Sequence, residues 1–139
     1  MKVMVLGKAT KESESGEFGS AEDFAAMDEY NQALVEAGIV LAADGLQPTS
    51  KGKRVAFDTD GTITVIDGPF AETKELIAGF SIWEVASMDE AVEWVKRSPF
   101  RDNVVEIRKI LDADDFSDSF AAEIAAAEEQ LRAKTTTDR

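Results

Sequence analysis

Apolar residues along this chain follow two periods, one typical of strands and one typical of amphipathic helices. Alternating or continuous apolar runs predict extended segments over 3–6, 39–43, 54–58, 62–66, 79–85 and 104–110. Apolar positions three or four apart predict helices over 20–38 and 87–98, and another from residue 116 onward. The elements alternate along the chain, and no internal repeat is present.

Capping residues mark the ends of the predicted helices. Ser20 and Asp23 stand three positions apart at the start of the first helix, and Gly38 supplies a left-handed stop at its end. Ser87 and Glu90 repeat the capping pattern before the second helix. The polar segment 10–19, which precedes the first helix, is expected to be a mobile loop.

Each predicted helix carries an apolar stripe, which on the second helix consists of Met88, Ala91, Val92 and Val95. On the first helix the stripe consists of Phe24, Met27, Tyr30 and Leu34. On the last helix it consists of Phe116, Phe120, Ile124, Ala127 and Leu131. Such stripes are usually packing surfaces rather than cofactor sites. Whether the last one packs on its own subunit or on a partner stays open, and residues 135–139 are expected to fray.

The clearest local signal is a hairpin. The β-rich runs 54–58 and 62–66 flank Thr59-Asp60-Gly61, and Asp-Gly favours the backbone angles of a tight turn. The order strand, helix, hairpin, strand, helix, strand describes an α+β sandwich of ferredoxin-like type, in which helices cover one face of the sheet. An additional amphipathic helix follows at the C-terminal end.

Composition limits the chemistry. The 139 residues fit one domain, and the chain has neither cysteine nor histidine. Imidazole-activated nucleophiles, thiolates and His or Cys metal ligands are therefore excluded, and acid–base work falls to Asp, Glu, Lys or Tyr. The formal net charge of -13 argues against nucleic acid and anionic membrane surfaces as partners. The first seven residues are too short for the apolar part of a signal peptide, so a cytoplasmic location is expected.

The segment after the hairpin supports a family assignment. Residues 67–75 read Asp-Gly-Pro-Phe-Ala-Glu-Thr-Lys-Glu, and Leu-Ile-Ala-Gly-Phe follows over 76–80. This segment resembles the signature of the YCII-related proteins, in particular the branch named for its DGPF motif. Further matches occur in the order that this branch shows, at Leu46-Gln47-Pro48, Trp83-Glu84-Val85, Ser98-Pro99 and Glu106-Ile107-Arg108.

The resemblance covers residues 1–111 and implies that two subunits pair sheet to sheet as a dimeric α+β barrel. Residues 112–139 lie outside it, as an acidic helical extension. YCII-related proteins outside the DGPF branch are described with a His–Asp pair in a cleft. This chain has no histidine, so a mechanism based on that pair does not transfer.

The signature contains the candidate catalytic residues. Asp67 would act as a general base, Lys74 would stabilise a developing oxyanion, and Glu72 is close enough in sequence to assist. The structural alternative assigns Asp67 to an Asx turn and places Glu72 and Lys74 in a salt-bridge network. Turn architecture is the preferred interpretation of the next three residues, Gly68, Pro69 and Phe70.

A second group of candidates lies on the predicted strands. Glu106 and Arg108 project to the same side of the last strand, where they either pair with each other or face a ligand. Together with Glu84, they are the candidate ligand-binding residues. Asp58 and Asp60 near Asp67 lack the spacing of a calcium loop, so no metal and no cofactor is expected.

Two functional classes follow. The first is a homodimeric protein that binds a small molecule, or a cofactor-free enzyme with lyase-like or isomerase-like acid–base chemistry. Similar dimeric α+β barrels suggest it by analogy of fold. The second is a non-enzymatic accessory or regulatory protein linked to an extracytoplasmic-function sigma factor, since DGPF-type domains are often encoded beside such factors. An acidic surface would then meet a basic partner.

Overall fold

The computed structural model describes residues 1–71, 75–116 and 120–137. The chain divides into two compact units, Met1–Lys109 and Ile110–Arg139, and each is described by itself. The sequence predicted a domain boundary after residue 111, two residues beyond the end of the first unit.

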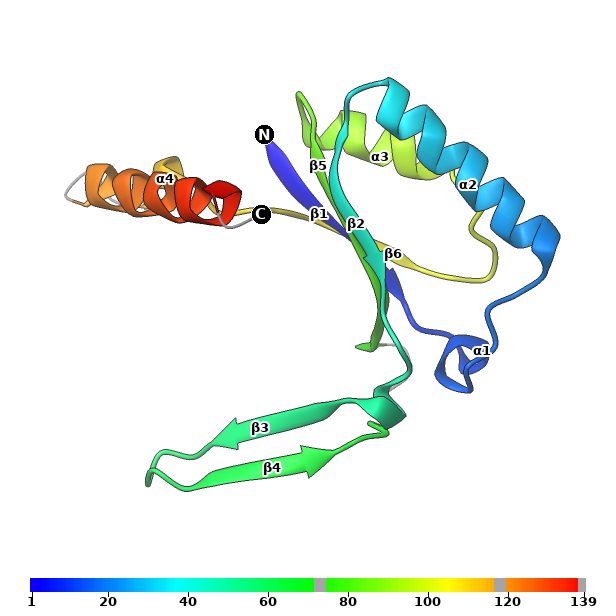
Figure 1. Cartoon of the computed structure of the whole chain (residues 1–139), viewed down its shortest axis with the longest axis horizontal. Coiled ribbons are helices and arrows are strands. Elements are labelled where there is room, and N and C mark those ends of the chain that lie inside the picture. Colours follow the sequence, from blue (N-terminus) through cyan, green and yellow to red (C-terminus); the bar gives the residue numbers. More distant parts are fainter. Residues whose placement is uncertain (72–74, 117–119, 138–139) are drawn as a thin grey trace. The chain divides into compact units, whose positions relative to one another are not determined.

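The first unit is built on a four-stranded antiparallel sheet with the strand order β2-β5-β1-β6. Its strands are β1 (Lys2–Lys8), β2 (Val40–Gly45), β5 (Ile77–Glu84) and β6 (Val105–Lys109). Two long helices, α2 (Ala21–Glu36) and α3 (Met88–Lys96), lie on one face of this sheet, as Figure 1 shows. The predicted α+β class is therefore confirmed.

The hydrophobic core lies between the sheet and these two helices. Val3 is fully buried, and Trp83 and Leu34 are each only 2% exposed. The remaining members of the buried cluster are Val5, Ile39, Val85 and Ala91. Side chains alternate across a strand, so Met4 and Leu6 point to the opposite face of β1, where they are only partly buried. This second surface is called the open sheet face below.

The caps of the two long helices follow the sequence closely. The Ser20 hydroxyl accepts from the Asp23 N–H at 3.1 Å, and the Asp23 carboxylate accepts from the Ser20 N–H at 3.2 Å. Gly38 has a φ of 72°, as predicted for the stop of α2. At α3 the Ser87 hydroxyl caps the Glu90 N–H as expected, whereas the Glu90 carboxylate accepts from the N–H of Ala86.

Two predictions for the N-terminal half were wrong. Segment 10–19 contains the short helix α1 (Lys11–Glu14), because the side chains of Thr10 and Ser13 cap each other's backbone N–H groups. Phe24 does not share the buried face of α2, since its side chain is 75% exposed. Burial increases along this helix toward Leu34, so the helix packs on the sheet mainly through its C-terminal half.

The hairpin is present but stands apart from the main sheet. Strands β3 (Lys53–Phe57) and β4 (Ile63–Asp67) pair only with each other, and the short 3-10 turn η1 (Thr49–Lys51) precedes them. Gly61 takes a φ of 90° in the turn, and the Asp60 carboxylate accepts from the Thr62 N–H, which lowers the pKa of that carboxyl group. Of the described strands between β1 and β5 in the sequence, the main sheet takes only β2, and the hairpin forms a separate two-stranded sheet. The predicted inclusion of the hairpin in the sandwich was therefore wrong.

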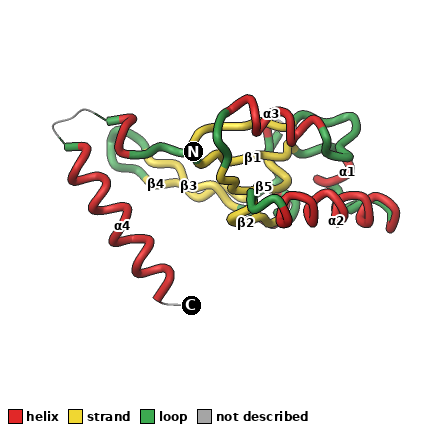
Figure 2. Tube along the Cα trace, turned by 90° about the horizontal axis from the view of Figure 1, so that it is seen from above, coloured by secondary structure: helices red, strands yellow, loops and turns green. Residues whose placement is uncertain are grey.

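The second unit consists of a 3-10 turn, η3 (Ala113–Asp115), and the helix α4 (Ala121–Thr137), which Figure 2 shows as one uninterrupted helix. Phe116 lies before this helix, with its ring 5.8 Å from that of Phe120, so its predicted place on the helical stripe was wrong. Residues up to Thr137 are helical, where fraying was expected from Thr135. The Thr135 hydroxyl donates to the Leu131 carbonyl at 3.0 Å and supports this last turn.

A partly buried hydrogen bond links the two long helices of the first unit. The Tyr30 hydroxyl on α2 donates to the Trp94 carbonyl on α3 at 2.6 Å. Partial burial raises the pKa of Tyr30 to about 12, and the nearby positive charge of Arg97 acts in the opposite direction. The folded state therefore favours the neutral phenol.

This shift predicts how stability depends on pH. The folded pKa lies above the ordinary value of 10.0, so the stabilisation is complete below pH 10 and is lost as the pH rises through about 12. Tyr30→Phe should remove this loss and should lower stability at neutral pH by about 1 kcal/mol. Urea unfolding against pH tests both effects. Tyr30 is the chain's only tyrosine, so tyrosinate absorbance reports its titration directly, and a native pKa near 10.0 would contradict the assignment.

Candidate functional site

The signature begins at the base of the hairpin. Asp67 is the last residue of β4 and lies opposite Lys53 in the register of the two strands. Its carboxylate pairs with the Lys53 ammonium group, and the Asp67 side chain is 75% exposed. The structure therefore places the predicted general base on a solvent-exposed ribbon, in an ion pair with the neighbouring strand.

The turn after Asp67 is closely packed against the backbone that precedes β3. The Gly68 N–H donates to the Gly52 carbonyl at 3.0 Å. An ideal Cβ atom on Gly68 would lie 1.6 Å from the Thr49 carbonyl oxygen, so no side chain fits there. The guanidinium group of Arg54 lies 3.8 Å from the centre of the Phe70 ring. These contacts give the predicted turn role of Gly68 and Phe70 a physical basis.

Thr49 joins this turn to α1. Its hydroxyl accepts from the Phe70 N–H at 3.1 Å and donates to the carboxylate of Glu14. The Thr49 backbone N–H donates to the same carboxylate at 2.9 Å. Glu14 was not among the predicted site residues, because it lies in the segment expected to be a loop. The base of the hairpin is thus tied to α1 through a single threonine.

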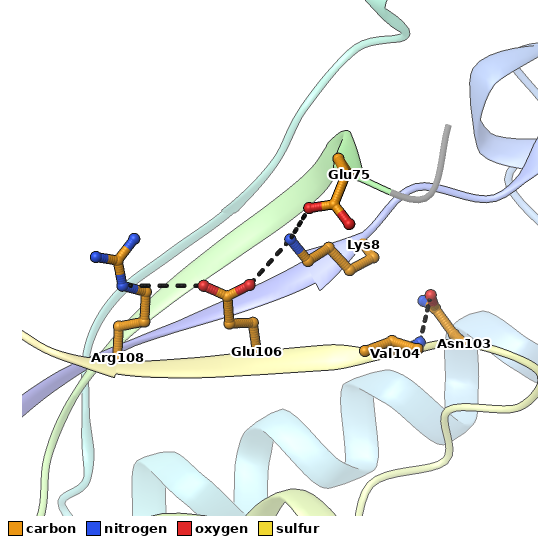
Figure 3. Close-up of polar contacts among 6 residues, drawn as sticks. All are labelled: Lys8, Glu75, Asn103, Val104, Glu106 and Arg108. Atoms are coloured by element: carbon orange, nitrogen blue, oxygen red, sulfur yellow. Dashed lines mark hydrogen bonds and ion pairs between the residues drawn. The ribbon is translucent and has the colours of Figure 1, made fainter. Parts of the chain in front are cut away.

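The second predicted group forms an ion-pair cluster, shown in Figure 3. Glu106 on β6 accepts from the Lys8 ammonium group at 3.0 Å, and its other oxygen lies 3.9 Å from Arg108 Nε. Glu75 lies 4.0 Å from the same Lys8 nitrogen. The Lys8 side chain is only 12% exposed, so it is the central cation of the cluster. Glu106 therefore pairs both with Arg108 and with Lys8, a lysine that was not among the predicted site residues.

The other predicted residues are not brought into this cluster. The carboxylate of Glu84 accepts from the N-terminal ammonium group of Met1 at 3.2 Å. Its register partner is Lys2, whereas Glu106 is paired with Leu6 further along β1. Glu72 and Lys74 lie outside the described residues, and their roles stay predictions.

A pocket lies between the sheet and the helices, on the face opposite to the Glu106 side chain, and Lys8 of the ion-pair cluster is among its lining residues. Its volume is about 490 Å³. Its walls come from α2, α3 and the loop before β6, through Met27, Tyr30, Asn31, Leu34, Val95, Phe100 and Asn103. None of the described candidates Asp67, Glu84, Glu106 and Arg108 lines it.

Three glycines in one row form the floor of this pocket. Gly7 on β1 is paired with Gly79 on β5, and Gly79 is paired with Gly45 on β2. The next two rows on this face are Val5, Ser81 and Ala43, and then Val3, Trp83 and Val40. Side-chain size thus decreases along the sheet. The large row fills the space under the helices, and the glycine row leaves it empty.

Sequence analysis did not identify this pocket. An isolated glycine in a strand often marks a place where another group approaches the backbone closely. Gly7, Gly45 and Gly79 are such residues, but their common row depends on the register of three strands that are distant in sequence. Among the described residues, no group of three or more acidic side chains is placed to hold a metal ion. No helix in the described ranges is long and apolar enough to cross a membrane.

These features define an α+β protein with a ligand-sized pocket between its sheet and its helices. The sequence matches the YCII-related domain over residues 1–114, so the chain belongs to the YCII-related domain family. It is 42% identical over 62 residues to an uncharacterized protein of Rhizobium meliloti (strain 1021), which corresponds to 45% of this chain and 49% of the relative. The match thus spans about half the length of that relative.

The fold was also compared with solved structures. One similar chain is the 5-chloro-2-hydroxyhydroquinone dehydrochlorinase of Burkholderia phenoliruptrix AC1100, solved in complex with 2,5-dihydroxybenzoquinone. The TM-score is 0.48 and the sequence identity 15%, over 84% of this chain and 100% of the other. A similarity of this size carries no information about the activity of the present protein.

The close packing at Gly68 yields a stability prediction. Gly68→Ala should destabilise the protein by about 2–3 kcal/mol or more, because the added methyl group collides with the Thr49 backbone. Gly52→Ala is the matched control from the facing segment before β3, since its Cβ would lie at an ordinary 3.5 Å from the same oxygen. Thermal melting of both variants compares them, and equal melting temperatures would contradict a structural role for Gly68.

Proposed function

We propose that this YCII-related protein binds a small molecule in the pocket above the glycine row. The observation that carries the proposal is the row of three glycines at one end of the sheet. These residues place no side chains in the space between the sheet and the helices, which side chains fill elsewhere. A volume of about 490 Å³ is within the range of small-molecule sites, which are mostly apolar with a few polar groups. The walls fit that description, since aromatic and aliphatic side chains predominate and two asparagines are present.

The predicted acid–base chemistry is a further part of the proposal. Asp67 does not line the pocket of its own chain. Lyase-like or isomerase-like catalysis by Asp67, Glu72 and Lys74 would therefore need the signature to reach a ligand by another route, such as from a second subunit. We also propose that the chain belongs to the DGPF branch, because residues 67–70 read Asp-Gly-Pro-Phe.

A homodimer is proposed on the basis of two apolar surfaces. The open sheet face carries the partly buried side chains Met4, Leu6, Phe80 and Ile82. One face of the hairpin carries the exposed pairs Val55 with Val65 and Phe57 with Ile63. An isolated two-stranded hairpin is only marginally stable in water. Pairing of two ferredoxin-like sandwiches through their open faces, as a dimeric α+β barrel, would cover such surfaces in both copies.

The hairpin provides a test of this assembly. Phe57→Ser combined with Ile63→Ser should weaken dimerisation on the order of tenfold or more, because two apolar anchors are lost. Thr64→Ala, on the other face of the ribbon, is the control and should leave the dimer unchanged. Sedimentation equilibrium measures the dissociation constants. A wild-type monomer would refute the homodimer, and a serine variant that dimerises normally would remove the hairpin from the interface.

The pocket is tested by filling its floor. An ideal Cβ atom on Gly45 has no heavy atom within 4 Å, so Gly45→Val should fold normally and occupy the pocket. Valine also suits a strand better than glycine, so the melting temperature should stay equal or rise. Ala42→Val is the matched control, because Ala42 lies on the same strand and points to the open sheet face.

A screen of small molecules by ligand-observed NMR then compares the three proteins. Ligands should bind to the wild type and to Ala42→Val, and binding to Gly45→Val should be lost. If no compound shows this difference, the pocket is not a binding site. An accessory role beside an extracytoplasmic-function sigma factor would then become the preferred function.

A further inference from the structure

We infer that the ligand of the glycine-floored pocket is a neutral molecule built on a planar ring. This inference rests on the proposed function and specifies the chemical class that the site selects. It follows from the shape of the floor and from the state of each charged or polar group that lines the pocket.

The floor determines the shape of the ligand. Gly7, Gly79 and Gly45 expose only backbone toward the helices, so three neighbouring strands present a continuous surface of peptide groups. Because this row lacks the side chains that the Val3 and Trp83 row carries, the space above it corresponds to one missing layer of side chains. A flat ring makes contact at about 3.5–4.0 Å over its whole surface in such a slot, whereas a puckered ring touches it at few atoms.

The position of Trp83 limits the length of the slot. Trp83 is 2% exposed and lies on the helix-facing side of the sheet, two rows away from the glycine row. Its indole N–H donates to the Ser81 hydroxyl at 2.6 Å, and that hydroxyl donates to the Ala42 carbonyl at 3.2 Å. The indole is thus held as an end wall of the slot, and the intervening Ser81 hydroxyl is already engaged. The space available to a ligand lies between this wall and the loop that carries Phe100.

The charged residues of the lining do not favour an ionic ligand. Among the described residues that line the pocket, only Lys8 and Asp44 carry a formal charge. The Lys8 ammonium group is paired with Glu106 and Glu75. Asp44 lies opposite Phe80, so its carboxylate points to the open sheet face and only its backbone reaches the pocket. An anion or a cation would therefore lose hydration without gaining a counterion.

The polar groups that remain are carboxamides. The Asn103 side-chain oxygen accepts from the Val104 N–H at 2.8 Å, as Figure 3 shows, and this leaves its NH₂ group as a donor. Among the described residues, none forms a hydrogen bond with the side chain of Asn31. Amides pair with neutral carbonyl, hydroxyl or amide groups. A ring that carries such a group would satisfy both the slot and its rim.

Four simple probes separate charge from shape. Benzamide is neutral and planar, benzoate is anionic, benzamidine is cationic, and cyclohexanecarboxamide is neutral but puckered. Ligand-observed NMR titration should show that benzamide binds the wild type at least about tenfold more tightly than each of the other three, because an unpaired charge or a poor fit costs that much. Gly45→Val should bind none of them, and Ala42→Val should match the wild type.

A substitution at Asn103 tests the polar part of the site. Asn103→Asp keeps the oxygen that accepts from Val104 and replaces the NH₂ donor with a second carboxylate oxygen. This variant should lose benzamide binding by at least about fivefold and should gain benzamidine binding, since it supplies the missing counterion. If its preference between the two probes equals that of the wild type, Asn103 does not contact the ligand and the inference fails.

The outcomes distinguish the inference from the proposed function. Equal binding of benzoate or benzamidine by the wild type overturns the neutral character, and equal binding of cyclohexanecarboxamide overturns the planar shape. If benzamide does not bind but another compound binds in a manner that Gly45→Val abolishes, the inference is wrong and the proposed function stands. If no compound is sensitive to Gly45→Val, the proposed function itself is wrong.

Discussion

The register between β1 and β5 is the constraint on which the other features of the first unit depend. It pairs Val3 with Trp83 at one end of the strands and Gly7 with Gly79 at the other. The first pair supplies the buried floor on which the helices pack, and Trp83 is among the largest fully buried side chains. The second pair leaves a gap of one side-chain layer. A shift of β5 by one residue would turn Trp83 and Gly79 to the open sheet face and would disrupt the core and the pocket together.

The two faces of the sheet differ in character: one carries the apolar core and the pocket, and the other carries the ion pairs of Glu106. The helix-facing side contains the hydrophobic core and the pocket, and Lys8 and Asp44 are the charged residues among the described part of its lining. The other side carries Glu106, whose carboxylate pairs with both Lys8 and Arg108. Successive side chains of a strand point to opposite faces of the sheet, so neighbouring residues of β6 contribute to both faces. Val105 lines the pocket, and Glu106 takes part in the ion pairs. The polar residues that attract attention in the sequence are therefore mostly separated from the cavity.

The DGPF segment takes on a different meaning in this arrangement. It was the best indicator of family, and the match to the YCII-related domain confirms that assignment at the family level. In three dimensions its glycine lies against the Thr49 backbone, and its phenylalanine ring lies beneath Arg54. Asp67 pairs with Lys53 at the base of an exposed ribbon. A motif can thus identify a family through the packing of a turn, while the pocket is formed by residues elsewhere in the chain.

Local sequence determined the elements of this protein, and tertiary structure decided what they enclose. Ser20, Gly38 and Asp60-Gly61 act through hydrogen bonds and backbone angles within a few residues, so the helix ends and the hairpin turn were predictable. The exposed position of Phe24 and the separation of the hairpin from the main sheet were not, because they depend on which segments pack together. The glycine row is the clearest case. Gly7, Gly45 and Gly79 are far apart in sequence, and only the pairing of β1, β5 and β2 places them side by side, with no side chains to fill the space beneath α2.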